Sequence, residues 1–542
     1  MFKIIHRIYT FLLPEERKTA MRVVITILVN TLMDFISLAT LMPVLYYLLE
    51  GMENNRAALL FCGLSISVVV LRCILSTWFI RFQNRFLLKL YKRLSLTLYS
   101  SYYNRGLLFI REHGANKLDY EVNVFCYAFS QSLLAPMAVI MGDGLLLILV
   151  VSVLLVYAPI TAGILAAAFI PFMIFYTHFI KKRVKMYGEL EQTAKREQYK
   201  LVAETFQGYS ELKVSNAFDL FSANFEEGTH KISQYRLKMA TLARLPLLLS
   251  ELSVVVGLAF LVMWGQGDIK ILVGIFAVAA FRLLPAMRSI LSGWTQIQNS
   301  IFILEALEEG IKDYCPQAEE TDENLSFKKD IVLKDISYSY PNGEEVLHNF
   351  NIQIRKGEQI GFSGYSGAGK STLFNIMLGF IRPTSGEVII DETPLTLKTQ
   401  KAWLKLIGYV SQEVFLFNGT LAENITIGCK EIDKERINQI LSDVSLLNWV
   451  KALPDGIDTI LGERGCKVSG GQRQRIGIAR ALYRKIDVLF LDEATSSLDD
   501  TTEAEIMETL QKLKKQYESL TILSIAHRRS SLAQCDRIIK LE

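Results

Sequence analysis

Six long apolar segments constrain the fold of this chain more than any other feature. Each has about 20 or more residues with few charges, the length that a helix needs to cross the hydrocarbon core of a bilayer. In chain order they are Met21 to Leu49, Ala57 to Ile80, Leu133 to Tyr157, Ile160 to Ile180, Leu245 to Trp264 and Ile269 to Leu291. One such segment alone could be a buried core helix, but six with polar connections favour membrane spans. Residues 1–311 are therefore predicted to form an all-α transmembrane domain of six helices.

The connections between these segments predict their orientation. Lysine and arginine follow the second span (81–111) and the fourth span (181–185), whereas the connections at 50–56, 158–159 and 265–268 are short. The positive-inside rule then puts both termini and the two long loops in the cytoplasm. Apolar periodicity inside both loops predicts that the spanning helices continue beyond the membrane, with short elements at the tips near 106–114 and 208–218. Phe2 to Leu13 is predicted to be an amphipathic helix on the membrane surface.

Composition excludes two classes of function. The net charge of +4 is small and scattered, which gives no argument for nucleic acid as a partner. The seven cysteines are odd in number and contain no C-x-x-C pair, so the sequence predicts neither a zinc site nor a disulfide framework.

The chain changes character after Ile311. Residues 312–330 are polar and acidic and are predicted to be a linker. From Ile331 onward, short apolar runs alternate with helical patterns, which is typical of an α/β domain over 331–542. The predicted strands are 331–340, 358–362, 386–390, 407–410, 488–491, 520–525 and 537–541.

A glycine-rich loop follows the second of these runs. Its sequence is Gly364-Tyr365-Ser366-Gly367-Ala368-Gly369-Lys370-Ser371, and a helical pattern begins at Ser371. Small residues let backbone N–H groups surround a phosphate, and the helix N-terminus adds a partial positive charge. Lys370 supplies a point charge for the outer phosphates, and Ser371 a hydroxyl for Mg²⁺. The alternative for this pattern by itself is an ordinary glycine-rich turn.

Two carboxylates end the apolar strand at 488–491. Asp492 suits a Mg²⁺ contact, and Glu493 suits a base for the attacking water. By itself a strand ending in Asp-Glu is usually an edge that reaches solvent, but ligands of open α/β sheets bind at this end of the strands. Together with the loop at 364–371 it indicates a nucleotide site.

A second anion-binding helix end follows Val468. Ser469 can cap the helix, and Gly470 and Gly471 leave its backbone bare. One nucleotide needs only one phosphate loop. The second helix end is therefore expected to close over the nucleotide of a partner domain.

These motifs, in this order, resemble the nucleotide-binding domain of ABC transporters. The residues that carry the resemblance are GYSGAGKS from Gly364, Gln412, VSGGQRQR from Val468, Asp492-Glu493, Ser497-Leu498-Asp499 and His527. With six spans before one such domain, the whole chain resembles an exporter-type half-transporter. The resemblance implies an exporter-type membrane domain followed by an α/β P-loop NTPase domain with an ABC helical subdomain.

The resemblance also implies roles for individual residues. Glu493 would be the catalytic base, His527 would contact the γ-phosphate, and Ser371, Gln412 and Asp492 would serve Mg²⁺ and the water. Tyr340 would stack on adenine, and Lys370 would hold the phosphates. The remaining residues expected to bind ATP are Gly364, Ser366, Gly367, Ala368, Gly369, Thr372 and Asp499, and, for the ATP of the other subunit, Ser469, Gly470, Gly471 and Gln472. Because one complete set is present, a homodimer is favoured, with a heterodimer left open.

Ionisable residues within the spans are the candidates for the substrate site, since charge is costly there. They are Asp34, Arg72, Glu251, Arg282 and Arg288. Each could instead belong to an interhelical ion pair, and Arg72 and Arg288 could reach the membrane interface. If Arg72, Arg282 and Arg288 form a basic wall, they would bind an anionic amphiphile such as a lipid diphosphate.

The membrane half is also similar to bacterial flippases of lipid-linked oligosaccharides, through Arg72, Pro246 with Glu251, and Arg282-Leu283-Leu284-Pro285. This resemblance implies transport across the bacterial inner membrane by alternating access, with the nucleotide-binding domain in the cytoplasm. Two other functions stay open: an exporter of peptides or hydrophobic drugs, and a nucleotide-gated channel or sensor.

Overall fold

The computed structural model divides into two compact units, Met1–Tyr314 and Cys315–Glu542. It describes residues 2–44, 55–157, 176–264, 269–312, 325–340, 345–429, 431–494, 499–526 and 532–541, with the single positions or pairs 159, 162–163, 166–167, 174, 343 and 528. The division between the units falls inside the segment 312–330 that the sequence predicts to be a linker.

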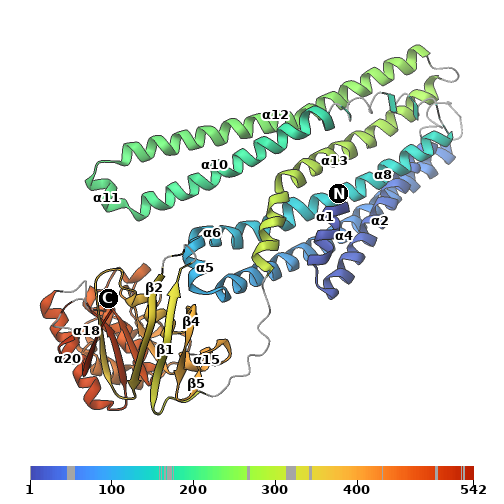
Figure 1. Ribbon diagram of the computed structural model, residues 1–542. Helices are drawn as coiled ribbons and strands as arrows, with labels where there is room; N and C mark the ends of the chain where they lie inside the picture. Colours follow the sequence, from blue (N-terminus) through green and yellow to red (C-terminus); the bar gives the residue numbers. More distant parts are fainter. Residues whose placement is uncertain are drawn as a thin grey trace. The chain divides into compact units, whose positions relative to one another are not determined.

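The described part of the N-terminal unit is helical (Figure 1). Its long helices are α1 (Phe2–Phe11), α2 (Pro14–Ala39), α4 (Asn55–Asn104), α8 (Ala135–Tyr157), α10 (Lys181–Gln207), α12 (Phe218–Trp264) and α13 (Ile269–Ile311). Shorter pieces are α5 (Gly106–His113), α6 (Ala115–Tyr120), α7 (Cys126–Ala128) and α11 (Tyr209–Val214), with π-helical turns at Glu121–Phe125, Phe129–Leu134 and Tyr176–Ile180.

Four described helical stretches are long and apolar enough to cross a membrane: Pro14–Val44, Leu59–Asn104, Ala115–Tyr157 and Phe276–Ile311. They coincide with the first, second, third and sixth predicted spans. The fifth predicted span is the end of α12, whose described apolar stretch is the shorter Glu251–Phe260. The fourth, 160–180, lies mostly outside the described residues.

The long loops form helices, as the apolar periodicity predicts. Helix α4 has 50 residues, about 75 Å of helix, which is more than twice the thickness of a bilayer core. Helices α10 and α12 run side by side and are joined through α11 (Figure 1). The two short helices α5 and α11 stand where the sequence predicts the loop tips.

The N-terminal helix α1 has the predicted amphipathic pattern, but its buried face packs on protein. Ile4, Ile8 and Leu12 are buried in one hydrophobic cluster with residues of α4 and α13, while Ile5 and Tyr9 stay exposed. Arg7 also makes two hydrogen bonds to Glu308 of α13, at 3.0 and 2.6 Å. The predicted amphipathic helix is therefore present, and its buried apolar residues pack on α4 and α13. Its place on the membrane surface stays a prediction.

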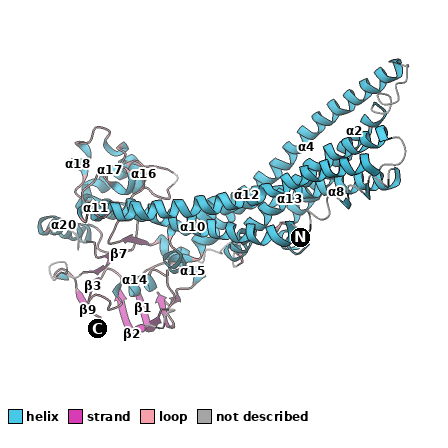
Figure 2. Ribbon diagram, turned by 90° about the horizontal axis from the view of Figure 1, so that it is seen from above, coloured by secondary structure: helices cyan, strands magenta, loops and turns pink. Residues whose placement is uncertain are grey.

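The C-terminal unit contains the strands of the described chain (Figure 2). An antiparallel sheet has the order β2-β1-β4-β5, and a parallel sheet has the order β6-β7-β8-β3-β9. The strands are β1 (Asp330–Ser339), β2 (Glu345–Arg355), β3 (Gln359–Ser363), β4 (Ser385–Ile390), β5 (Thr393–Pro394), β6 (Ile407–Val410), β7 (Val488–Asp492), β8 (Thr521–Ile525) and β9 (Arg537–Lys540). Seven of the nine match predicted runs within two residues. The sequence interpretation missed β2 and β5.

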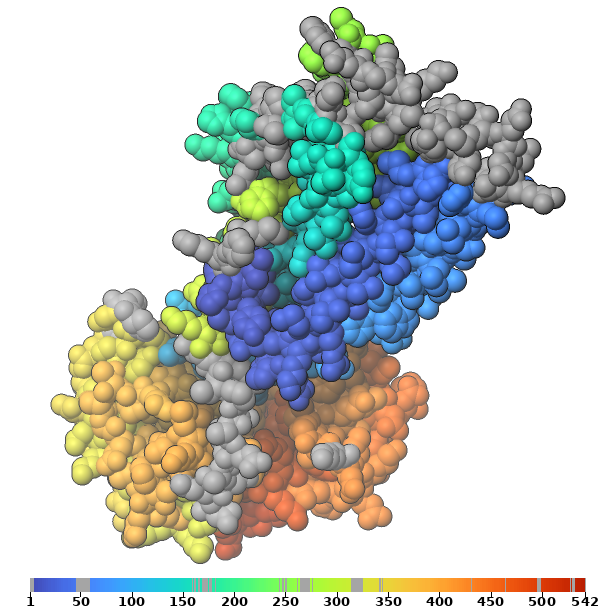
Figure 3. All heavy atoms as spheres, turned by 90° about the vertical axis from the view of Figure 1, so that its right-hand side faces the viewer, coloured from blue at the N-terminus to red at the C-terminus, as the bar shows by residue number. Residues whose placement is uncertain are grey.

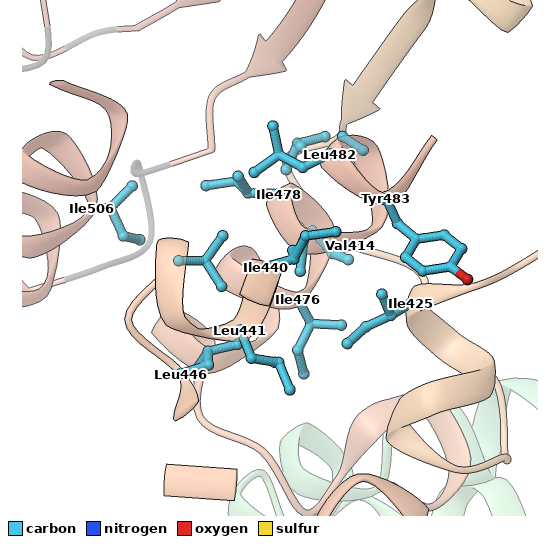
Figure 4. Packing of buried hydrophobic residues seen from close by; sticks show 14 of the residues in the cluster. Val414, Ile425, Ile440, Leu441, Leu446, Ile476, Ile478, Leu482, Tyr483 and Ile506 are labelled. Atoms are coloured by element: carbon cyan, nitrogen blue, oxygen red, sulfur yellow. The ribbon is translucent and has the colours of Figure 1, made fainter. Parts of the chain in front are cut away.

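The helices of this unit are α14 (Lys370–Met377), α15 (Leu397–Lys405), α16 (Leu421–Ile425), α17 (Lys434–Asp443), α18 (Leu447–Lys451), α19 (Gly470–Tyr483) and α20 (Asp500–Gln516), with 3₁₀ turns at Gly456–Asp458 and Glu463–Gly465. Figure 4 shows Ile440 and Leu441 of α17 packed against Ile476 and Ile478 of α19 in one buried cluster. This apolar contact makes α16 to α19 a helical subdomain attached to the parallel sheet through α19 and β6.

An aromatic stack joins the parallel sheet to α14. The rings of Phe362 and Phe374 lie 5.7 Å apart, and those of Phe374 and Phe490 lie 5.2 Å apart, each pair edge to face. All three side chains are at most 1% exposed. The stack fixes the helix that follows the glycine-rich loop against the strand that ends in Asp492.

Phe490→Ala should lower the free energy of unfolding of the C-terminal unit by about 3–5 kcal/mol, because it leaves a buried cavity at one end of this stack. Denaturant unfolding of the purified full-length chain, followed by its aromatic signal, measures the change. Phe415→Ala is the matched control, since Phe415 is 64% exposed and its loss should cost no more than about 0.5 kcal/mol. Equal losses in the two variants would contradict this assignment of the core.

Candidate functional site

The loop at 364–371 connects β3 to α14 and is shaped by backbone that excludes side chains. Gly369 caps α14 with a φ of 80°, and a Cβ at that position would lie 2.8 Å from Val346 Cγ1. A Cβ at Gly364 would lie 2.6 Å from the carbonyl oxygen of Leu541. Both close approaches require glycine. The loop therefore exposes peptide groups at the start of a helix, as phosphate binding needs.

Lys370 turns back into the loop. Its Nζ donates to the carbonyl oxygens of Gly364 at 3.0 Å and Tyr365 at 2.8 Å, and the residue is 5% exposed. The ammonium group is thus already held at the inner face of the loop. Ala368 and Thr372 are buried, whereas Ser366, Gly367 and Ser371 are exposed. The hydroxyl groups of Thr372 and Tyr340 are 3.1 Å apart, which ties Tyr340 to α14.

The parallel sheet brings the other predicted residues to one edge. Gln412 follows β6, Asp492 ends β7 with Glu493 next to it, and the glycine-rich loop follows β3. Because these strands are parallel, their carboxyl ends lie on the same side of the sheet. His527 follows β8 in sequence but lies outside the described residues.

Gln412 and Glu493 contact each other directly. Gln412 Nε2 donates to Glu493 Oε2 at 3.0 Å. Glu493 has a φ of 50°, an uncommon value for a residue with a side chain, and its N–H donates to the carbonyl of Ile525 on β8. The strained backbone turns the glutamate out of the strand direction at the edge where the loop lies.

Two residues that the sequence interpretation did not select support this edge. The hydroxyl of Tyr409 on β6 donates to Asp492 Oδ2 at 3.3 Å. The side-chain amide of Gln474 on α19 donates to the carbonyl oxygen of Gln412 at 2.9 Å. The second was recognisable in principle, because Gln474 lies in the VSGGQRQR motif on the same helix as Ser469.

Helix α19 begins with a complete capping box. The N–H of Gln472 donates to Ser469 Oγ at 3.3 Å, and the N–H of Ser469 donates to Gln472 Oε1 at 2.9 Å. Ser469 and Gly470 are exposed at this helix start. Gly471 is buried, and a Cβ there would lie 2.3 Å from Thr502 Cγ2. The helix end is therefore rigid and open to solvent.

Asp499 caps the next helix, α20. Hydrogen bonds from Thr501 and from the side chain and backbone of Thr502 hold the pKa of the Asp499 carboxyl well below its usual range. Arg528, the neighbour of His527, pairs with Glu503 at 2.5 Å and Asp500 at 2.8 Å on the same helix. Asp499 and Arg528 are therefore both attached to the start of α20.

The membrane-domain arginines lie in two separate ion-pair clusters. Asp34 of α2 binds Arg72 of α4 through Oδ1, and its Oδ2 lies 2.8 Å from Nη2 of Arg282 on α13. Arg288 pairs with Glu251 at 3.3 Å, and both of those side chains are more than half exposed. Six residues of helix turn a side chain by about 600°, so Arg288 leaves α13 about 120° away from Arg282. The basic wall of Arg72, Arg282 and Arg288 is therefore not formed. The interhelical ion pairs left open as the alternative are present: Arg72 and Arg282 share one carboxylate, and Arg288 pairs separately.

Comparison with known proteins identifies the family. The family model described as ABC transporter matches residues 347–496. An ATP-dependent lipid A-core flippase of Ralstonia nicotianae is 30% identical to this chain over 406 residues, covering 73% of this chain and 68% of the relative. The chain belongs to the ABC transporter family. The uncharacterized ABC transporter ATP-binding protein YwjA of Bacillus subtilis is 43% identical over 212 residues, 39% of this chain and 36% of that protein.

The fold agrees with this ABC transporter assignment over nearly the whole chain. A solved structure of a bacterial Atm1-family ABC exporter with ATP bound is similar with a TM-score of 0.82 at 20% identity, covering 97% of this chain and 93% of that one. The predicted fold class is confirmed: a helical membrane domain of the exporter type is fused to one nucleotide-binding domain. The chain is a multi-pass membrane half-transporter that couples ATP hydrolysis to transport.

Proposed function

We propose that two copies of this ABC transporter form a homodimeric flippase that moves a phosphate-bearing lipid, such as a lipid-linked oligosaccharide or another anionic glycolipid, across the bacterial inner membrane. The nucleotide-binding domains would lie in the cytoplasm. The observation that carries the substrate class is the convergence of Arg72 and Arg282 on one partly buried carboxylate within the spanning helices. The relatives named as lipid A-core flippases support a lipid substrate.

The helices around Arg72 and Arg282 line two cavities, which could receive the headgroup and the apolar chain of an amphiphile. Asp34 lines a cavity of about 250 Å³ that is about half polar, and its polar side chains include Asn30, Gln83 and Asp143. The next turns of α2 line a nearly wholly apolar cavity of about 300 Å³, through Phe35 and Leu38 opposite Leu154 of α8. The first cavity, with its polar side chains, suits the charged headgroup of a lipid, and the apolar cavity next to it suits the lipid chain.

Each nucleotide site would be built from two chains. The glycine-rich loop with Lys370 would hold the phosphates of one ATP, and the exposed helix start at Ser469 would close over the ATP of the partner. Asp499, at the start of α20, would also contribute to ATP binding. Glu493 would accept a proton from the attacking water, after its hydrogen bond with Gln412 is exchanged for contacts with the nucleotide.

Mg²⁺ fits the oxygen donors at this edge. Ser371, Gln412 and Asp492 supply a hydroxyl, an amide and a carboxylate oxygen, which are the ligand types that Mg²⁺ prefers. When bound, the ion would neutralise charge on the phosphate oxygens. The ring of Tyr340, fixed by Thr372, would stack on adenine, and His527 would contact the γ-phosphate.

Transport would follow from the different affinity of ATP for the two arrangements of the dimer. ATP binds between the closed domains more tightly than to separated ones, and only this difference can drive closure. The tips at α5 and α11 would pass closure to the spanning helices. Hydrolysis at Glu493 would restore the open state.

Lipid-stimulated ATP turnover in nanodiscs tests the substrate class. A polyprenyl-diphosphate sugar or a lipid A-core glycolipid should raise turnover several-fold, whereas peptides and cationic drugs should not. Replacing both Arg72 and Arg282 with alanine should reduce the ratio of stimulated to basal turnover to about one, because the paired guanidinium donors for phosphate are lost. Arg93→Ala is the matched control, since Arg93 also forms a partly buried ion pair, at 2.7 Å with Glu16. Stimulation by drugs alone would overturn the lipid proposal.

A further inference from the structure

Asp34 occupies the donors that Arg72 and Arg282 would offer to a phosphate. One carboxylate oxygen binds Nε of Arg72, and the other binds Nη2 of Arg282 at 2.8 Å. The three residues come from three different helices: α2 and α4 pack side by side, as the adjoining dark and lighter blue surfaces in Figure 3 show, and α2 and α13 both pack against α8. In this arrangement Asp34 is the anion in the position where an anionic headgroup would bind.

Burial explains why such a counterion is needed. The side chains of Asp34, Arg72 and Arg282 are 16%, 26% and 25% exposed. Two guanidinium groups without a partner in the spanning region would be strongly unfavourable, since desolvated charge is stable only when paired. Asp34 supplies that partner in the empty transporter.

The charges do not cancel, however. Within the ion-pair cluster two guanidinium groups face one carboxylate, because Asp143, the other carboxylate near Arg282, is hydrogen-bonded to Ser289 instead. A single carboxylate satisfies only part of the donors of two arginines. A phosphate or diphosphate carries more negative charge and can bind guanidinium in a bidentate way. A headgroup of this kind can therefore compete with Asp34 for the same donors.

A cavity beside Asp34 can accept its side chain when the carboxylate is displaced from the arginines. Its side chain lines this cavity of about 250 Å³, together with Asn30, Gln83 and Asp143. Asn30 is itself hydrogen-bonded to Ser76 of α4, and Asp143 to Ser289 of α13. The amide groups of Asn30 and Gln83 can donate to a displaced carboxylate.

We infer that Asp34 is a built-in competitor of the substrate: it neutralises Arg72 and Arg282 in the empty transporter and is displaced from them by the phosphate group of a lipid headgroup. This inference rests on the proposed function and adds a residue that sets affinity and selectivity. A headgroup with a single negative charge binds the two arginines little more strongly than the carboxylate of Asp34 does, so its net binding free energy is small. A diphosphate gains more, so the competitor makes the site select for highly charged headgroups.

The test is lipid binding to the full-length transporter in nanodiscs made of a neutral phospholipid. Undecaprenyl diphosphate, undecaprenyl monophosphate and undecaprenol are the probes, and a lipid A-core glycolipid is run in parallel to distinguish the two sources of phosphate. Asp34→Asn should bind undecaprenyl diphosphate about tenfold more tightly than the wild type, because one competing charge is removed. The gain should be smaller for the monophosphate and absent for undecaprenol.

Three further variants separate this inference from general electrostatics and from misfolding. Asp143→Asn removes the same charge from the same cavity but from a carboxylate bonded to Ser289, so its gain should be at most about twofold. Asp34→Ser removes the same charge with a smaller side chain, and it takes the place of Asp34→Asn if that variant does not fold. Asp34→Glu keeps the carboxylate and should stay close to the wild type.

The outcomes are distinct. Unchanged or weaker diphosphate binding by the uncharged Asp34 variants, with the wild type still preferring phosphate-bearing lipids, overturns the inference and leaves the proposed function standing. An equal gain in Asp143→Asn overturns it as well. A wild type that binds no phosphate-bearing lipid more tightly than undecaprenol overturns both. The lipid that shows the gain identifies the source of the phosphate.

Discussion

Replacing Glu493 with glutamine should lower ATP turnover by about 10²–10⁴-fold, the usual contribution of a general base, while ATP binding persists. Glutamine keeps the size of the side chain and can still accept the hydrogen bond that Gln412 donates at 3.0 Å. It has lost only the ability to take a proton from water. Glutamine should tolerate the backbone φ of 50° at position 493 as glutamate does, so the side chain should keep its position.

Phosphate release by the purified transporter measures turnover, and retention of labelled ATP on a filter measures binding. Glu505→Gln is the matched control, because Glu505 is an exposed carboxylate on α20 that pairs with Arg475 and should leave turnover within about a factor of two. Undiminished hydrolysis in Glu493→Gln would show that another group is the base. Loss of ATP binding would instead assign Glu493 to the nucleotide pocket.

Mixed dimers should show that Ser469 of one chain serves the ATP held by the other. Ser469→Arg fills the exposed helix start, and Glu493→Gln removes the base. With both changes in one chain and a wild-type partner, each site contains one defect, and turnover should fall to the level of the Glu493→Gln homodimer. With one change in each chain, both defects fall in the same site and the other site stays intact, so turnover should reach about half of wild type.

A self-contained site in each chain predicts the reverse order of activities. Dimers of defined composition are obtained with a different affinity tag on each chain and two successive purifications. The single-variant homodimers provide the baseline for both arrangements. Higher activity with both changes in one chain than with one change in each would therefore contradict the shared site.

Much of the nucleotide-binding unit follows from local sequence because its chemistry depends on backbone. The positions of Gly364 and Gly369 admit no side chain, a requirement that leaves a recognisable pattern in the sequence. The resemblance to ABC transporters already predicts that Gln412 and Glu493 serve one site, and the parallel pairing of β6 and β7 brings both to one edge of the sheet. The structure adds the hydrogen bond between them.

The missed elements have specific causes. Strand β2 alternates buried and exposed positions only in part, because it is an edge strand of the antiparallel sheet. Its asparagines Asn349 and Asn351 hydrogen-bond to Ser337 and Asp335 of β1, which a local pattern does not show. The sequence analysis did not select Tyr409 or Arg528, because their partners lie far from them in the sequence. Tyr409 on β6 binds Asp492 on β7, and Arg528 binds Glu503 on α20. A pairing of this kind is a property of tertiary packing.

The sequence by itself determined the two-unit organisation and the apolar helices, and it predicted the residues of the nucleotide site. Each is encoded by composition, periodicity or a short motif whose function depends on backbone geometry. Only the tertiary structure decided which charged side chains of the membrane half form ion pairs with one another. Asp34, Arg72 and Arg282 are separated by 38 and 210 residues along the chain, yet helix packing brings them into one ion-pair cluster. The direction in which each side chain leaves its helix, and which helix faces it, is set by that packing and by no local pattern.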